Sequence, residues 1–277
     1  MKKGLVMALS LTLVLSFAAC GNNGTTDSSA SSEEVSSVAS ESKDDASVES
    51  TEEVSSEAEN TDVAGETVMS YADYVAAELE SPVVIEAYVQ AHQSWWDNKI
   101  TVYAADEDGA YFIYNMTCSE EDSAKLVPGT KIKVTGYKTE WSGEVEIAEG
   151  ATFEIEDGSY IAEATDVTDL LGTDDLINYQ NQFVSFKGMT VEESEGGAAF
   201  LYNWDGSGSA DSNSDLYFNV SLNGQTYTFT VESYLCDNTT DVYKTVEGLK
   251  VGDVIDMEGF LYWYNGVNPH ITNVTVK

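Results

Sequence analysis

The chain has 277 residues, of which 49 are acidic and 12 are basic, and every basic one is a lysine, which gives a net charge of -37 at pH 7. A surface this acidic repels a phosphate backbone, whose neutralisation supplies most nonspecific affinity for nucleic acid. We therefore expect that nucleic acid is not a partner. With 3 cysteines and 2 histidines, the chain is also poorly supplied with catalytic and metal-binding groups, so we expect no enzyme activity and no cofactor.

Residues 1–19 have the pattern of an export signal. Lys2 and Lys3 precede an apolar run, Leu5 to Ala19, that is too short to span a bilayer comfortably and ends in small residues. The segment resembles a bacterial lipobox, which implies that Cys20 is lipidated on its sulfur and becomes the first residue of the mature protein. We expect a lipid anchor on the extracytoplasmic face of the cell membrane. An ordinary secretory signal with an incidental cysteine is the alternative.

Residues 20–66 are predicted to form a disordered acidic tether behind the lipidated cysteine. From Gly21 the composition is dominated by Ser, Glu, Asp, Thr, Ala and Val and contains no aromatic residue. Such a segment cannot bury enough apolar surface to offset the entropy of ordering. Between Asp27 and Glu66 there are 13 acidic residues against the single Lys43, so charge repulsion extends the chain.

Residues 67–277 are long enough for two domains of about 100 residues each, and an internal repeat supports that division. Seven residues of one segment recur at a constant offset in a second segment. They are Leu126, Gly129, Ile132, Gly136, Tyr137, Trp141 and Gly143, which recur as Leu249, Gly252, Ile255, Gly259, Phe260, Tyr264 and Gly266. Each copy predicts a strand interrupted by a glycine, which marks a bulge or barrel corner. A tight turn and a last strand follow.

The elements expected upstream of these hairpins have the same order in both copies. The first copy predicts a short helix at 71–80, strands at 82–91, 99–105 and 110–116, and a helix at 119–126. The second predicts a helix at 168–179, strands at 182–191, 198–204, 215–222 and 225–231, and a helix near 241–247. Three strands, a helix and a strand hairpin are the order of the OB-fold. We predict a mainly β protein with two tandem OB-like five-stranded barrels, at 67–160 and 161–277.

Two segments carry a resemblance to a known type of protein. These are Gly-Thr-Lys-Ile-Lys-Val-Thr-Gly-Tyr from Gly129 and Gly-Asp-Val-Ile-Asp-Met-Glu-Gly-Phe-Leu-Tyr-Trp-Tyr-Asn-Gly from Gly252. With the leader, the chain resembles exported clostridial lipoproteins that carry tandem OB-like domains. Such motifs point to a fold more than to a function, because OB-like domains bind nucleic acid, sugars and proteins.

Aromatic residues in the expected recognition loops are the candidate ligand-binding residues. In an OB-fold the loops between strands 1 and 2 and between strands 4 and 5 commonly bind ligand. The candidates there are Trp95, Trp96 and Trp141 in the first copy and Tyr262, Trp263 and Tyr264 in the second. Such rings stack on sugars or form the centre of a protein interface, and core packing is the alternative for all six.

Other groups give weaker signals. Asp205, Asp211, Asn213 and Asp215 place oxygens at alternating positions, as in some calcium loops, but the Gly and Glu of an EF-hand are missing. Cys118 and Cys236 are the best pair for a disulfide, with two buried free thiols as the alternative.

The lysines and the two histidines favour structural roles. Lys125, Lys131, Lys133 and Lys138 form a possible basic patch, for which a solvated strand edge is favoured. His92 and His270 occupy different positions in the two copies, so a structural role is favoured for each.

These observations predict a membrane-anchored extracytoplasmic binding protein, with a carbohydrate or cell-wall component as the leading ligand. The second reading is an acidic scaffolding protein that docks a protein partner, and the third is a nucleic-acid-binding OB module.

Overall fold

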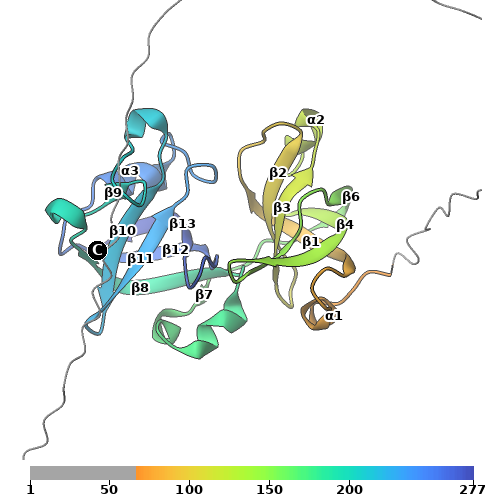
Figure 1. Cartoon of the computed structure of the whole chain (residues 1–277), viewed down its shortest axis with the longest axis horizontal. Coiled ribbons are helices and arrows are strands. Elements are labelled where there is room, and N and C mark those ends of the chain that lie inside the picture. Colours follow the sequence, from red (N-terminus) through yellow and green to blue (C-terminus); the bar gives the residue numbers. More distant parts are fainter. Residues whose placement is uncertain (1–66) are drawn as a thin grey trace, which may run out of the picture. The chain divides into compact units, whose positions relative to one another are not determined.

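The computed structural model describes residues 67–277, which form two β-barrels (Figure 1). The predicted signal peptide of residues 1–19, Cys20 and the tether of residues 20–66 lie outside the described residues. None of the helices between residues 67 and 277 is both long enough and apolar enough to cross a membrane.

The first barrel is closed by five strands. They are β1 (Pro82–His92), β2 (Lys99–Ala105), β3 (Ala110–Thr117), β4 (Thr130–Trp141) and β5 (Glu144–Ile147). They pair in the order β1-β2-β3-β5-β4, and β4 closes the barrel by pairing with β1. The β3–β5 pairing is parallel and the others are antiparallel. This is the OB-fold that the order of elements predicted.

The second barrel repeats this arrangement. Its strands are β8 (Phe183–Glu192), β10 (Leu216–Leu222), β11 (Gln225–Val231), β12 (Val254–Phe260) and β13 (His270–Val276). The order is β8-β12-β13-β11-β10, and β10 closes on β8. The single parallel pairing joins β11 to β13, the counterparts of β3 and β5. The prediction of two five-stranded barrels is confirmed.

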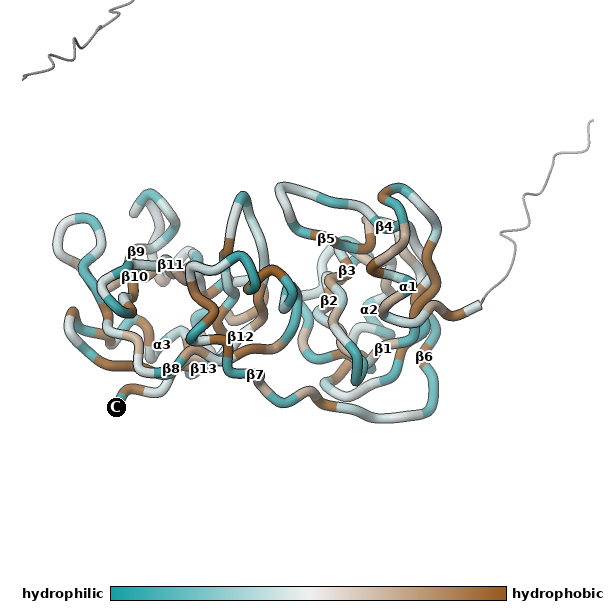
Figure 2. The backbone as a smooth tube through the Cα atoms, turned by 90° about the horizontal axis from the view of Figure 1, so that it is seen from below, coloured by the Kyte–Doolittle hydropathy of each residue, from teal (hydrophilic) through white to brown (hydrophobic). Residues whose placement is uncertain are grey.

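Alternation of apolar and polar residues explains why these segments are strands. Along β1 the side chains of Val83, Ile85, Ala87 and Val89 are buried, while the residues between them are partly exposed, as expected where successive side chains point to opposite faces of a sheet. The hydropathy of the trace accordingly changes from residue to residue along the chain (Figure 2). Each barrel has its own core of buried residues.

The glycines inside the repeated strands have the role that the sequence predicted. A Cβ on Gly259 would lie 2.2 Å from the backbone oxygen of His270, and the β12–β13 register shifts at this residue. A Cβ on Gly136 would lie 2.6 Å from a methyl carbon of Ile147. Only glycine therefore permits the close approach of the neighbouring strand at these bends.

One predicted strand is wrong in its role. The segment 198–204 does not supply the second strand of the second barrel, which is β10. Only β9 (Leu201–Tyr202) forms there, and it pairs with one end of β10. Tyr202 donates a hydrogen bond of 2.7 Å to Glu247, which holds this segment beside the barrel. Two further strands were not predicted: β6 (Thr152–Ser159) extends the first sheet along β4, and β7 (Thr165–Asp166) pairs with β8.

Short helices occupy the predicted positions. They are α1 (Tyr71–Ala76), α2 (Glu120–Ser123) and α3 (Asp241–Glu247), with 3₁₀ turns η1 (Thr168–Leu170), η2 (Asp174–Tyr179), η3 (Glu195–Gly197) and η4 (Ala210–Ser212). The side chains of Ser119 and Thr240 cap α2 and α3 by accepting backbone N–H bonds. The predicted helix at 168–179 splits into η1 and η2 because Gly172 adopts a φ of 79° between them.

A third apolar cluster joins the two barrels. It consists of Tyr103, Phe112 and Phe260, with Phe183 and Tyr262 among the residues packed against it. The rings of Tyr103 and Phe260 are stacked with their centroids 4.3 Å apart. Tyr103 and Phe112 come from β2 and β3, so the first barrel contributes one outer face of its sheet to this contact.

Candidate ligand-binding site

The expected recognition loops of the first barrel contact the second barrel. The backbone N–H of Ser94, in the β1–β2 loop, donates 2.7 Å to the carbonyl of Tyr234, and the N–H of Asn265 donates 2.6 Å to the carbonyl of Ser142, in the β4–β5 turn. The Gln93 amide donates 3.1 Å to Glu232. These loops are therefore held against the second barrel.

Polar contacts around β5 fix the same junction. The Glu144 carboxylate accepts from the backbone N–H of Trp263 at 2.8 Å and from the amide of Gln180 at 3.2 Å. The amide of Asn181 donates 3.0 Å to the carbonyl of Val145. Because Glu144 is fully buried, its pKa is raised to about 8, mainly by desolvation.

A cavity of about 390 Å³ lies beside these contacts and is lined by both barrels. The first barrel contributes the β1–β2 loop, β3, β4 and β5, and the second contributes the residue after β11, the β12–β13 loop and the first residue of β13. The lining residues are Gln93, Phe112, Tyr114, Trp141, Glu146, Glu232, Tyr262 and His270. Four of the eight carry phenyl, phenol or indole rings and two carry carboxylates, a combination that offers flat apolar faces beside hydrogen-bond acceptors.

Both carboxylates of this cavity have altered acidity. Burial raises the pKa of Glu146 to about 7. Burial also raises the pKa of Glu232 to about 7, with a further contribution from the negative charge of Asp215. Perturbed acids in a cleft are a common property of functional sites.

His270 forms part of the cavity wall. Its Nδ1 lies 2.7 Å from the phenol oxygen of Tyr103, and its ring is stacked on Tyr262 with the centroids 4.4 Å apart. Desolvation lowers the pKa of His270 to about 3, so the imidazole is neutral at pH 7. A structural role for this histidine, which the sequence favoured, agrees with these contacts.

A second cavity, of about 450 Å³, shares Gln93, Tyr114 and Glu232 with the first. Its other lining residues are Ser94, Trp96, Lys99, Ile100, Thr101, Asn115 and Tyr234. We call the two adjoining cavities the interbarrel groove. Trp96 and Tyr234 are strongly exposed in it, so the groove presents aromatic faces along its length.

The structure separates the six aromatic candidates. Trp141 and Tyr262 line the first cavity and Trp96 the second, and Tyr264 packs on Trp141 with the ring centroids 5.1 Å apart. Trp95 packs against the core of the first barrel and donates its indole N–H to the carbonyl of Cys118 at 2.9 Å. Trp263 packs against the core of the second barrel.

Six residues of the first cavity were not among the candidates: Gln93, Phe112, Tyr114, Glu146, Glu232 and His270. Phe112, Tyr114 and Glu146 lie within β3 and β5. The alternation of apolar and polar residues along a strand predicts only whether a side chain faces the core or the surface of its own barrel. Nothing in the sequence shows that this face of the first barrel meets the second barrel. The only available signal was that three of the four residues from Tyr111 to Tyr114 are aromatic, and aromatic residues are common in any strand.

The oxygen-rich segment 205–215 does not form a calcium loop. Asp205 accepts from the N–H of Ser207 at 3.0 Å, Asn213 from Asn238 at 2.9 Å and Asp215 from Ser233 at 2.8 Å. These oxygens thus satisfy backbone donors in separate places. Within residues 67–277, no group of three or more His, Cys, Asp or Glu side chains is placed to hold a metal ion.

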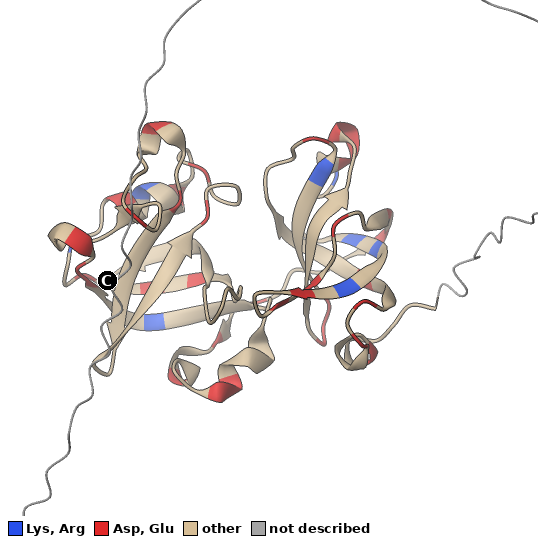
Figure 3. Ribbon diagram, viewed as in Figure 1, with Lys and Arg blue, Asp and Glu red and all other residues tan. Residues whose placement is uncertain are grey.

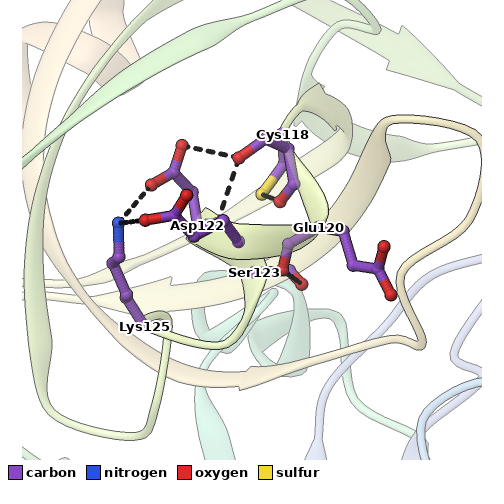
Figure 4. A network of polar contacts seen from close by, with 7 residues as sticks. Cys118, Glu120, Asp122, Ser123 and Lys125 are labelled. Atoms are coloured by element: carbon purple, nitrogen blue, oxygen red, sulfur yellow. Dashed lines mark hydrogen bonds and ion pairs between the residues drawn. The ribbon is translucent and has the colours of Figure 1, made fainter.

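The two cysteines of the barrels are free and buried, so the disulfide between Cys118 and Cys236 is not formed. Burial raises the pKa of Cys118 to about 11 and that of Cys236 to about 12. The thiol of Cys118 donates to the carbonyl of Ser119 beside α2, as Figure 4 shows. Each thiol belongs to its own barrel.

The four clustered lysines do not form a free basic patch. Lys125 pairs with Asp122 and Glu121 (Figure 4), and Lys131 pairs with Glu86 and Glu156. Lys138 was expected at a solvated strand edge but is only 6% exposed. That expectation is wrong because the Lys138 ammonium group donates to three carbonyls at the end of α1. Figure 3 shows lysines and acidic residues interspersed along the ribbon.

The comparison with known proteins shows a likeness of fold. No protein-family model and no curated protein matches the sequence. Similar solved structures include the Ifi202 HINa domain in complex with 20bp dsDNA, at 14% identity over 72% of this chain and 96% of that chain, with a TM-score of 0.32. A murine DNA binding protein bound with dsDNA is 11% identical over 71% and 96%, with a TM-score of 0.35. The tetrameric p202 HIN2 is 12% identical over 72% and 96%, with a TM-score of 0.31.

Two of these structures hold double-stranded DNA. This finding contradicts the expectation that nucleic acid is not a partner, but DNA binding is a property of those proteins, and the likeness shows only the fold of this chain. The expectation was drawn from net charge, which is a sum over the whole chain and does not describe the potential at one surface. Nucleic acid therefore belongs among the ligands to be tested.

Proposed function

We propose that this protein is a membrane-anchored extracytoplasmic lipoprotein that binds a carbohydrate or another cell-wall component in the interbarrel groove. The observation that carries the proposal is the composition of the groove. Trp96, Tyr114 and Trp141 are partly or largely exposed rings, and Gln93, Glu146 and Glu232 supply amide and carboxylate groups beside them. Rings stack on sugar faces while such polar groups bind hydroxyls.

The anchor rests on the sequence pattern that ends at Cys20. A lipid on this residue keeps the barrels at the cell surface, where wall polymers and their fragments are found. Replacing Cys20 by Ala removes the only acyl acceptor that the signal offers, so the variant is expected in the released fraction or as uncleaved precursor. Unchanged membrane partition of C20A contradicts the anchor and leaves the groove proposal standing.

The groove is tested with the unlipidated mature chain, from which the lipid-accepting Cys20 is omitted to leave residues 21–277, on a glycan array and by calorimetry with wall-derived oligosaccharides. Binding that persists at moderate salt and falls at least tenfold in Trp141→Ala supports the proposal. Tyr137→Ala is a matched control, because Tyr137 is also an exposed ring on β4 but does not line either cavity of the groove. Because paired carboxylates also serve glycoside hydrolysis, the incubated oligosaccharides are examined for cleavage.

The alternatives appear as other outcomes of the same screen. Retention on basic proteins that disappears at moderate salt favours a scaffolding protein, since exposed charge pairs are screened. Binding to single- or double-stranded DNA without glycan binding favours a nucleic-acid module. Either result, in the absence of glycan binding, overturns the carbohydrate proposal.

A further inference from the structure

We propose that the ligand of the interbarrel groove carries a positively charged amino or ammonium group, held by the carboxylates of Glu146 and Glu232 against the surrounding rings. This inference rests on the proposed function only in taking the groove as the ligand site. It specifies the charge of the ligand, which the proposed function does not.

Glu146 is the first reason. Its side chain comes from β5, is only 6% exposed and lines the first cavity. Its carboxylate receives no hydrogen bond and no ion pair from any residue between 67 and 277. Burying a carboxylate without a partner is costly, so an acid in this position has an unfilled capacity for a cation.

Glu232 is the second reason. It follows β11 and lines both cavities. The side-chain donor that reaches it is the neutral amide of Gln93, at 3.1 Å. None of the seven ion pairs formed within the described residues includes Glu232. The charge of this carboxylate therefore has no counterion within residues 67–277.

The groove also offers no cation of its own to these acids. Lys99 lines the second cavity, but its ammonium group pairs with Glu149. The imidazole of His270 is neutral at pH 7, because burial lowers its pKa to about 3. A neutral sugar would donate hydroxyl bonds but would supply no counterion when these carboxyl groups ionise, whereas an ammonium group supplies one.

The aromatic wall fits the same chemistry. Phe112, Tyr114, Trp141 and Tyr262 line the first cavity together with both acids. Aromatic faces attract ammonium groups through the ring quadrupole, and rings arranged around a cavity recognise quaternary ammonium ligands in this way. Amino sugars, polyamines and choline-like groups share the required charge.

The test uses pairs of probes that differ in charge. Calorimetry on the unlipidated mature chain compares choline with 3,3-dimethylbutan-1-ol, which has the same shape without the charge, and glucosamine oligosaccharides with their N-acetylated forms. We expect the charged member of each pair to bind at least tenfold more tightly. Glu146→Gln and Glu232→Gln should each weaken the charged member at least tenfold and leave the neutral member unchanged. Glu140→Gln, an exposed acid on β4, should change neither.

The outcomes separate the two proposals. Equal binding of charged and neutral oligosaccharides, or full affinity in Glu146→Gln with its melting temperature retained, overturns the inference while the carbohydrate proposal stands. Binding of choline without binding of any oligosaccharide supports the inference and overturns the carbohydrate proposal. No binding of any probe overturns both.

Discussion

The phenol oxygen of Tyr103 on β2 lies 2.7 Å from Nδ1 of His270 at the start of β13, so the two barrels share a buried hydrogen bond. The bond lies within the apolar cluster that joins the barrels, where Tyr103 is stacked on Phe260. It also holds the His270 ring, which forms a wall of the first cavity. The contact between the barrels and the shape of the groove therefore depend on the same pair.

The first prediction concerns this bond. Tyr103→Phe keeps the ring but leaves Nδ1 of His270 buried without its partner, which should lower the free energy of unfolding by about 1 to 3 kcal/mol. Urea denaturation measures the change. Tyr137→Phe is the matched control, because the exposed ring of Tyr137 on β4 makes no hydrogen bond through its hydroxyl with the residues from 67 to 277. Equal stability of the two variants contradicts the role of the bond.

The second prediction concerns Glu144, whose folded-state pKa is raised to about 8 from 4.5. Below pH 4.5 the Glu144 carboxyl is protonated in both the folded and the unfolded chain, and its contribution to the stability of the fold is at its maximum. Between pH 4.5 and 8 the unfolded chain releases this proton and the folded protein keeps it, so stability from this group is lost as the pH rises. Glu144→Gln removes the titration. It should match the native protein near pH 5 and exceed its stability by more than about 1 kcal/mol at pH 9.

Chemical denaturation of both proteins from pH 5 to pH 9 measures this difference. Gln retains an oxygen to accept the backbone N–H of Trp263, which Glu144 accepts at 2.8 Å, so the contact between the barrels is preserved. The pH dependence of His270 has the opposite sign. Its pKa is lowered to about 3 from 6.5, so its contribution to folding stability is lost as the pH falls below 6.5, equally in the native protein and in Glu144→Gln. A constant stability difference between Glu144→Gln and the native protein across the range would contradict the buried titration.

Much of each barrel could be predicted from the sequence, because local patterns determine it. The alternation of apolar and polar residues around Ile132 predicted the strands, and the recurrence of Gly136 as Gly259 predicted their bends. The order of these elements predicted the OB-fold. The extra strand β6 was missed because its residues are largely exposed and lack the inward alternation that marks a barrel strand. The segment around Leu201 was assigned to the barrel because apolar composition does not show which neighbour a short strand pairs with.

The groove was predictable only in part, for a different reason. Trp96 lies in the β1–β2 loop and Trp141 ends β4 beside the β4–β5 turn, and an OB-fold presents both places to ligands, so their positions followed from the fold. Glu146 and Glu232 enter the site because one barrel packs on the other, and the pairing of two surfaces is not encoded in a local pattern. A buried glutamate within a strand looks in the sequence like any surface residue.

The third prediction concerns Lys138, a buried residue of β4 whose ammonium group donates 3.0, 2.8 and 2.8 Å bonds to the carbonyls of Tyr74, Val75 and Ala77. A cation at a helix C-terminus satisfies carbonyls that lack helical partners. Lys138→Met keeps the apolar stem and removes the donors, so the free energy of unfolding should fall by about 1 to 3 kcal/mol. Amide exchange in α1 should also become faster.

Lys133→Met is the control for this variant. Lys133 lies on the same strand and its ammonium group makes no hydrogen bond or ion pair with residues 67–277, so its loss should change stability by less than about 0.5 kcal/mol. If Lys133→Met and Lys138→Met have the same effect, the contact with α1 contributes nothing measurable.

The last prediction separates the neighbouring residues Trp95 and Trp96. Trp95 packs on the core of the first barrel and donates to the carbonyl of Cys118, so Trp95→Ala should cost about 3 to 5 kcal/mol, as for other large core truncations. Trp96 is 73% exposed and Trp141 is 53% exposed. Replacing either by Ala should cost less than about 1 kcal/mol of folding stability and weaken ligand binding by about 1 to 3 kcal/mol. Thermal melts and calorimetry on the three single variants measure both quantities. If Trp96→Ala and Trp141→Ala destabilise the fold as strongly as Trp95→Ala, their rings support the barrel, and the groove loses its aromatic binding surface.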